Sequence, residues 1–256
     1  MTVLFGFASP LHGASFLAGD DLESNRKVRV DKVLFVWRRF AVGVYGLDTL
    51  LEAVQFSSYG CQDAQSVRFS TGSEIKPVND VRSLCERAAG CIPRLAAKYR
   101  RNVARQVAAG ELTPRQRDQM LSSGGGLVVL DCEEMQLHHA RLRGQVLQEG
   151  STAAFDIESF PKERAFRFAI NEPLDVGPIT VDMAAKPRRW CRPEVVAARL
   201  ECEGAGFPGT IGDLGASFTN RADQTEFFSA FASVDDYMTA HAVPPYTPGA
   251  GTSKAR

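Results

Sequence analysis

The chain has 256 residues, 44% of them hydrophobic, and its 30 Lys and Arg residues balance 30 Asp and Glu residues. A chain of this length buries about 70–75% of its unfolded surface in one or two domains. The zero net charge gives no overall attraction to nucleic acid or to a membrane surface. No apolar run approaches the ~18 residues that span a bilayer, and the start of the chain lacks the segments of a signal peptide. We therefore expect a cytoplasmic protein without membrane attachment.

The first part of the chain predicts two β-hairpins followed by a helix. Runs rich in apolar and β-branched residues alternate with turn-forming residues, which is the pattern of paired strands. The predicted strands are 2–8, 14–19, 31–37 and 40–45, and the predicted helix covers 49–56.

Thr2 carries the first chemical signal. Methionine aminopeptidases remove Met before small residues, so we expect the mature chain to begin with Thr2. A terminal Thr combines a hydroxyl nucleophile with a free α-amine, whose pKa of about 8 suits a general base. Such a pair is one of the recognised ways to activate a hydroxyl group. Many proteins start with Met-Thr, however, so this residue needs support from the rest of the sequence.

Three further residues follow Thr2 in a specific order. Asp20 closes the second predicted strand, Lys32 precedes the apolar part of the third, and Gly46 follows the fourth. The set resembles the start of a proteasome β subunit, or of the peptidase subunit of a bacterial two-component ATP-dependent protease. Both belong to the N-terminal nucleophile (Ntn) hydrolases. The number of residues from Lys32 to Gly46 is the same as in the family. The interval from Thr2 to Asp20 is slightly longer and that from Asp20 to Lys32 is shorter, in hairpin loops where length varies. The resemblance covers about the first 55 residues and fades beyond them.

The resemblance implies a role for each of the four residues. Thr2 Oγ would attack a carbonyl carbon while its own α-amine takes the proton through a water. The Lys32 ammonium would favour the alkoxide, and Asp20 would keep Lys32 charged and oriented. The backbone N–H of Gly46 would donate to the tetrahedral oxyanion. Supporting polar residues of the family have candidates here by composition alone: Asp213, Ser217 and Asp223.

The resemblance also implies a fold and an activity. The fold is α/β, a four-layer αββα Ntn-hydrolase-type sandwich of two antiparallel sheets flanked by helices. We expect one such domain over residues 1–242 and a disordered Pro- and Gly-rich tail at 243–256. The activity is that of a threonine endopeptidase acting on a peptide or protein substrate, with no cofactor and no metal. Family members form homo-oligomeric rings and work with an ATPase partner.

The remaining elements are predicted from periodicity and turn residues. Residues 57–76 indicate a loop, and a helical region from Pro77 to Gly110 follows, in which Pro93 either divides the region or starts a second helix. Beyond it we expect helices at 114–121, 193–200 and 225–240, turns at 204–215, and strands at 127–132, 135–142, 151–157, 164–170 and 179–183.

Three alternatives remain open. The first is a catalytically inactive scaffold on the same fold. The second is a nucleic-acid-binding or regulatory protein that uses the basic helices at 82–117, although the balanced net charge and the lack of a binding motif disfavour nucleic acid as a partner. The third is a Cys-His pair formed by Cys132 and His138, whose spacing matches no known geometry. The six cysteines are otherwise expected to be reduced thiols.

Overall fold

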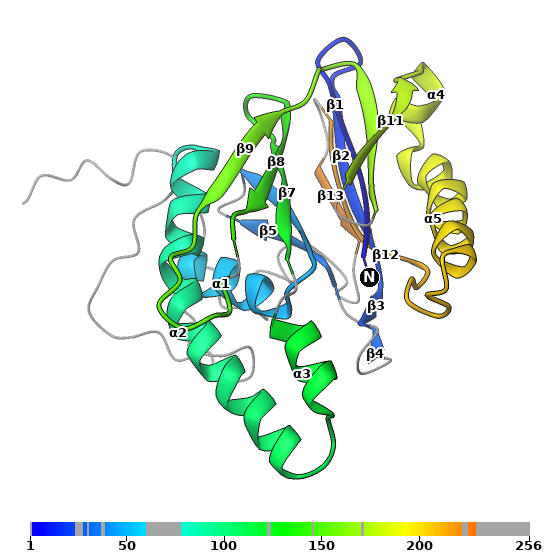
Figure 1. Cartoon of the computed structure of the whole chain (residues 1–256). Coiled ribbons are helices and arrows are strands. Elements are labelled where there is room, and N and C mark those ends of the chain that lie inside the picture. Colours follow the sequence, from blue (N-terminus) through cyan, green and yellow to red (C-terminus); the bar gives the residue numbers. More distant parts are fainter. Residues whose placement is uncertain are drawn as a thin grey trace, which may run out of the picture.

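Two antiparallel sheets lie face to face, with helices covering both outer surfaces (Figure 1). This is the four-layer αββα sandwich expected from the sequence, which is thereby confirmed. The computed structural model describes residues 2–23, 28–29, 31–36, 39–59, 78–121, 124–144, 146–169, 172–221 and 225–228. The predicted tail at 243–256 lies outside these residues.

The first sheet has six strands and contains the start of the chain. Its strand order is β11-β10-β1-β2-β12-β13, so the first hairpin lies at its centre. The strands are β1 (Val3–Ser9), β2 (Ala14–Asp20), β10 (Arg164–Ala169), β11 (Glu172–Pro178), β12 (Leu214–Arg221) and β13 (Thr225–Phe228). Every residue of β1 and β2 is buried. Both hairpin strands are therefore mostly apolar along their whole length, because both of their faces are covered.

The second sheet has five strands in the order β5-β6-β7-β8-β9, which is also their order in the chain. The strands are β5 (Val33–Val36), β6 (Phe40–Tyr45), β7 (Gly126–Asp131), β8 (Gln136–Leu142) and β9 (Phe155–Ser159). A short separate hairpin, β3 (Leu22–Glu23) with β4 (Val28–Arg29), follows β2. The two hairpins predicted at the start of the chain are thus confirmed, one at the centre of the first sheet and one at the edge of the second.

Helices form the two outer layers. On the five-stranded sheet lie α1 (Asp48–Tyr59) and the long α2 (Val81–Ala108), and α3 (Pro114–Leu121) returns beside the distal half of α2 (Figure 1). On the six-stranded sheet lie α4 (Val181–Ala185) and α5 (Pro187–Gly204). No helix in the described residues is long and apolar enough to cross a membrane.

Alternating side chains of the two sheets form the central core. Leu4 and Ala8 of β1 belong to the cluster between the sheets, whereas Phe5 and Phe7 belong to the cluster beneath α4 and α5. The rings of Phe35 and Phe218 stack across the two sheets with their centroids 4.5 Å apart. This period of two fixes which face of β1 meets the other sheet.

Several predicted elements differ from the structure. Pro93 lies inside one continuous α2, so the division of this region into two helices is wrong. Buried residues continue on both sides of the proline, and their packing outweighs the lost backbone hydrogen bond. The strand predicted at 179–183 is also wrong, since α4 begins at Val181 and is capped by the Thr180 side chain.

The C-terminal part contains the other corrections. The predicted helix at 225–240 is wrong for its first residues, because Thr225–Phe228 is the edge strand β13. Residues 229–240 lie outside the described residues. The predicted helix at 193–200 starts earlier, at Pro187, and encloses Pro193. Strands β11 and β12 were not predicted, and residues 57–59, predicted as loop, belong to α1.

Candidate active site

Asp20 and Lys32 form a buried ion pair at one end of the sandwich. Lys32 Nζ donates to both carboxylate oxygens of Asp20, at 2.9 Å to Oδ1 and 2.8 Å to Oδ2. The side chain of Asp20 is 0% exposed and that of Lys32 is 9% exposed. Two residues from different hairpins, which the sequence separates by a loop, are therefore brought together. Burial on this scale requires charges to be paired and hydrogen-bonded.

Asp20 also organises the backbone of three chain segments. Its Oδ1 accepts the N–H of Val3 at 2.8 Å. Its Oδ2 accepts the N–H of Leu22 at 3.3 Å and that of Gly212 at 3.2 Å. The carboxylate consequently joins the first strand, the exit of its own strand and the loop before β12.

Thr2 lies beside this ion pair because of its place in the chain. It is the residue before Val3, whose amide is bound to Asp20, and it is half-buried at the start of β1. The ammonium of Lys32 is bound to the same carboxylate oxygen as the Val3 amide. Thr2, Asp20 and Lys32 therefore lie in one region of the structure.

Gly19 makes room for the stem of Lys32. It pairs opposite Leu4 in the first hairpin. A Cβ atom at Gly19 would lie 3.3 Å from Cβ of Lys32 and 3.1 Å from the Leu4 side chain. The main chain of Lys32 is also held in place, because its carbonyl accepts the N–H of Val44 at 3.0 Å. The lysine stem is thus held between the two sheets.

Gly46 lies at the same end of the five-stranded sheet as Lys32. Lys32 directly precedes β5 and Gly46 directly follows β6, and these two strands are paired antiparallel. Gly46 is exposed and has a φ of +84°. A Cβ atom here would lie 2.2 Å from the carbonyl oxygen of Gly124 and 2.5 Å from Cα of Gly125. Two backbone segments approach so closely at this point that only glycine fits, whatever its chemical role.

The loop before β12 lies against Asp20, a contact that the sequence did not predict although Asp213 was a candidate. Besides the bond from Gly212 to Asp20, Asp21 N–H donates to the Asp213 carbonyl and Asp213 N–H donates to the Asp21 side chain, both at 2.9 Å. Arg199 of α5 binds the Asp213 carboxylate at 2.8 Å and also the Gly212 carbonyl. Asp213 is therefore near the ion pair, but its side chain is 70% exposed.

The other supporting candidates fall elsewhere. Ser217 is buried within β12, where its hydroxyl accepts a hydrogen bond from Arg188 Nη1 at 2.6 Å. Asp223 lies outside the described residues. Within the described part of the chain, the Ser217 hydroxyl bonds to Arg188 and not to Thr2 or Lys32.

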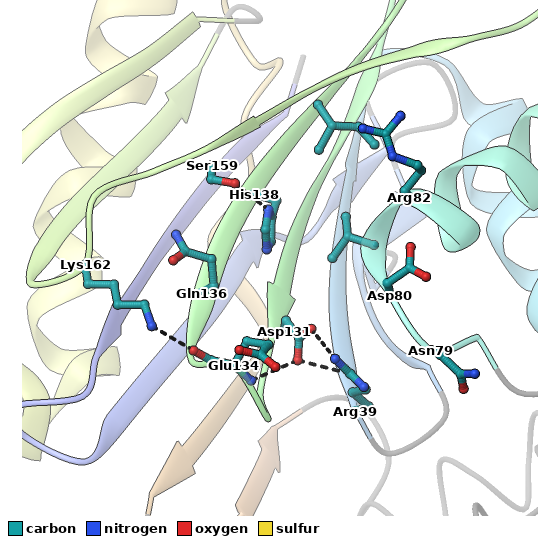
Figure 2. Close-up of a pocket in the computed structure, with 12 residues that line it drawn as sticks. Arg39, Asn79, Asp80, Arg82, Asp131, Glu134, Gln136, His138, Ser159 and Lys162 are labelled. Carbon is teal, nitrogen blue, oxygen red and sulfur yellow. Dashed lines mark hydrogen bonds and ion pairs between the residues drawn. The ribbon is translucent and has the colours of Figure 1, made fainter.

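A polar cleft of about 530 Å³ opens at the opposite end of the five-stranded sheet (Figure 2). Its walls come from the β5–β6 turn, the β7–β8 turn, β9 and the N-terminus of α2. Arg39 binds Asp131 there through two contacts, at 3.2 and 2.7 Å, and Lys162 donates to the carbonyl of Glu134 at 3.0 Å. None of the four candidate residues lines this cleft. The contacts of Arg39 and Lys162 hold the turns around this cleft, at the end of the sheet opposite Lys32 and Gly46.

The histidines and cysteines of the second sheet form no catalytic pair. His138 shares a hydrogen bond of 3.0 Å with Ser159, and burial lowers the pKa of its imidazole. Burial raises the pKa of the Cys132 thiol, and the nearby Asp131 carboxylate adds to this effect. A thiol that stays protonated is a poor nucleophile. Among the described residues, no three His, Cys, Asp or Glu side chains lie close enough together to hold a metal ion.

A buried polar pair joins Tyr45 and His139 inside the core. The Tyr45 hydroxyl and His139 Nε2 are 2.6 Å apart. Burial raises the pKa of Tyr45 to about 12 and, together with the charge of Arg141, lowers that of His139 to about 4. The imidazole is therefore neutral at neutral pH. Because it packs against Phe160 and Phe168, this pair is part of the core.

Comparison with known proteins gives a distant structural likeness. No family model matches the chain, and no curated protein sequence matches it. Among solved structures, Anbu (ancestral beta-subunit) from Yersinia bercovieri is similar with a TM-score of 0.36 and 9% sequence identity. That match covers 94% of this chain and 91% of the other.

Proposed function

We propose that the protein is a threonine-type peptidase or amidohydrolase in which Thr2, once it is the first residue of the mature chain, is the nucleophile. The observation that carries the proposal is the buried Asp20–Lys32 pair, whose carboxylate binds the N–H of Val3, the residue after Thr2. A fixed ammonium at this position lowers the cost of ionising a neighbouring hydroxyl. Asp20 holds it in place through two hydrogen bonds.

The proposed reaction has two halves. The hydroxyl proton of Thr2 passes to its own α-amine through a water, and Oγ bonds to the carbonyl carbon of the scissile amide. The tetrahedral oxyanion accepts a hydrogen bond from the Gly46 N–H, and its collapse breaks the C–N bond as the leaving amine takes the proton. A water then hydrolyses the ester, which releases the acid and restores the Thr2 hydroxyl. The scheme uses no metal and no organic cofactor.

The position of Gly46 supports its part in this scheme. An oxyanion donor must be exposed and must allow the substrate close to the backbone. Gly46 is exposed, lacks a side chain and lies at the Lys32 end of the sheet. Peptides or proteins are the proposed substrates, and assembly into a ring with an ATPase partner belongs to the same proposal.

Hydrolysis of fluorescein-labelled casein tests the proposal. We expect cleavage by the wild type and its loss in Thr2→Ala and Lys32→Met, with partial retention in Thr2→Ser, which keeps a hydroxyl. Removing a nucleophile typically lowers the rate by several orders of magnitude. Cleavage by Thr2→Ala at the wild-type rate would exclude Thr2 as the nucleophile.

The competing proposal is an inactive scaffold, and one observation favours it. Asp20 accepts three backbone N–H groups in addition to Lys32, so its burial can be explained by its role in the fold alone. This proposal expects Thr2→Ala to leave every function of the protein intact. It also expects wild-type protein to leave labelled casein uncleaved.

The basic helices give weaker grounds for a nucleic-acid partner. Several of their cations are already engaged: Lys98 pairs with Glu52 at 3.7 Å, and Arg100 donates to the Leu147 carbonyl at 2.8 Å. Arg117 pairs with its neighbour Asp118. If nucleic acid were the partner, its retention would fall steeply with salt and would disappear when Arg100, Arg101 and Arg105 are all changed to Glu.

A further inference from the structure

The outer face of α5 carries an exposed stripe of five residues, here called the α5 stripe: Arg189, Arg192, Val196, Leu200 and Glu203. Each residue turns an α-helix by 100°, which places these five within an arc of about 80°. All are exposed, and the two apolar side chains are 50% and 62% exposed. The buried residues of α5 face the six-stranded sheet on the other side of the helix.

The charges of this stripe oppose the helix dipole. Cations occupy its N-terminal end and an anion occupies its C-terminal end, whereas an isolated helix is stabilised by the reverse order. The first turn of α5 contains no acidic residue and the last turn no basic one. Arg189, Arg192 and Glu203 make no ion pair with another described residue. A partner that brings opposite charges to both ends of the stripe would offset this cost.

We propose that the α5 stripe is a self-association surface, on which α5 of a second copy of the chain packs antiparallel about a two-fold axis. With the axis near the middle of the stripe, Val196 of each copy faces Leu200 of the other. Arg192 of each copy then faces Glu203 of the other, so both ends of the interface gain an ion pair. Antiparallel packing also brings the positive end of each helix dipole to the negative end of its partner.

A second copy fits this surface better than an unrelated partner does because the surface is complementary to itself. A two-fold interface needs one patch that matches its own rotated copy, and a stripe that is basic at one end, apolar in the middle and acidic at the other meets that need. Arg192 and Glu203 are about 16 Å apart along the helix, so the apolar residues lie between the two charge pairs. Phe207, 47% exposed, adds apolar surface beyond the acidic end.

The stripe alone is smaller than a standard protein interface, so the association is expected to be reversible and to depend on concentration. The proposal does not depend on the chemistry of Thr2. An inactive scaffold would associate through the same face.

Sedimentation equilibrium of the whole chain at micromolar concentrations tests the pairing through charge swaps. Arg192→Glu and Glu203→Arg each place like charges opposite one another at both ends of the interface. We expect each single variant to associate at least about tenfold more weakly than the wild type. The double variant Arg192→Glu/Glu203→Arg restores opposite charges and should recover the association. An equimolar mixture of the two single variants should form mixed dimers for the same reason.

Thermal unfolding separates association from folding. Each single swap puts a charge where the helix dipole favours it, so the monomer should be no less stable than the wild type. Two results would overturn the proposal: a wild-type chain that stays monomeric over the concentration range, or single variants that associate as tightly as the wild type. Failure of the mixed variants to pair would rule out the antiparallel arrangement.

Discussion

Replacing Lys32 by Met removes the ammonium of the buried ion pair and keeps most of the side-chain volume. Asp20 would then be a fully buried carboxylate without its counter-charge. Removing one partner of a buried pair typically costs about 3–5 kcal/mol. Three backbone N–H groups still solvate the carboxylate, so we expect the lower end, a loss of about 3 kcal/mol in the free energy of unfolding.

Lys98→Met provides the matched control, since the same substitution there breaks only an exposed pair. Lys98 and Glu52 are 3.7 Å apart, with side chains 49% and 45% exposed. Such pairs contribute about 0–1 kcal/mol. Urea unfolding at neutral pH measures both variants. A Lys32→Met loss within about 1 kcal/mol of the Lys98→Met loss would refute the view that this pair is buried and unscreened.

Two further predictions concern the core and the Gly46 turn. The pKa of His139 is lowered to about 4 in the folded chain, so the unfolded chain binds its proton first as the pH falls. The free energy of unfolding should therefore have its full value above pH ~6.5 and fall by about 3 kcal/mol between pH ~6.5 and ~4. Urea unfolding measured at a series of pH values should show a flatter curve in this range for His139→Gln. An unchanged slope would contradict the assignment of the low pKa to His139. Gly46→Ala should destabilise the fold by about 3 kcal/mol, because it adds both left-handed strain and a clash with the Gly124 carbonyl. Gly110→Ala shares the positive φ but meets no atom within 4 Å, so thermal unfolding should show a loss of only about 1 kcal/mol; equal losses would mean that the backbone approach at Gly46 is looser than described.

The sequence predicted the N-terminal half of the fold because its signals are local. Each hairpin consists of two apolar segments joined by a short turn, and each strand pairs with the next one along the chain. Asp20 and Lys32 could be proposed as neighbours only through the family resemblance. Their contact is a consequence of sheet packing, which no local pattern encodes.

The second half was harder to predict because its strands pair over long distances. β12 joins β2, and β10 joins β1, across most of the chain. β11 contains Pro173 and Pro178, which usually argue against a strand, and it is tolerated as an edge strand. A helix was predicted at 225–240, whereas the four residues of β13 take their conformation from pairing with β12.

The loop around Gly212, near the candidate site, also makes contacts with distant residues that the sequence did not predict. The turns predicted at 204–215 are confirmed only between the two elements, because Gly204 ends α5 and Gly215 belongs to β12. A Cβ atom at Gly212 would lie 2.8 Å from the backbone nitrogen of Leu22, so the glycine is required by a contact with a residue far away in the chain. Only the folded chain shows that this loop donates a hydrogen bond to Asp20.

The central claim, that Thr2 is an N-terminal nucleophile, is tested most directly by intact-mass measurement after incubation with an epoxyketone. This reagent attaches at two points and needs both the hydroxyl and the free α-amine of one residue. We expect a wild-type chain that begins at Thr2 and carries one adduct, and no adduct on Thr2→Ala. A chain that keeps a residue before Thr2, or equal labelling of the Thr2→Ala variant, would contradict the claim.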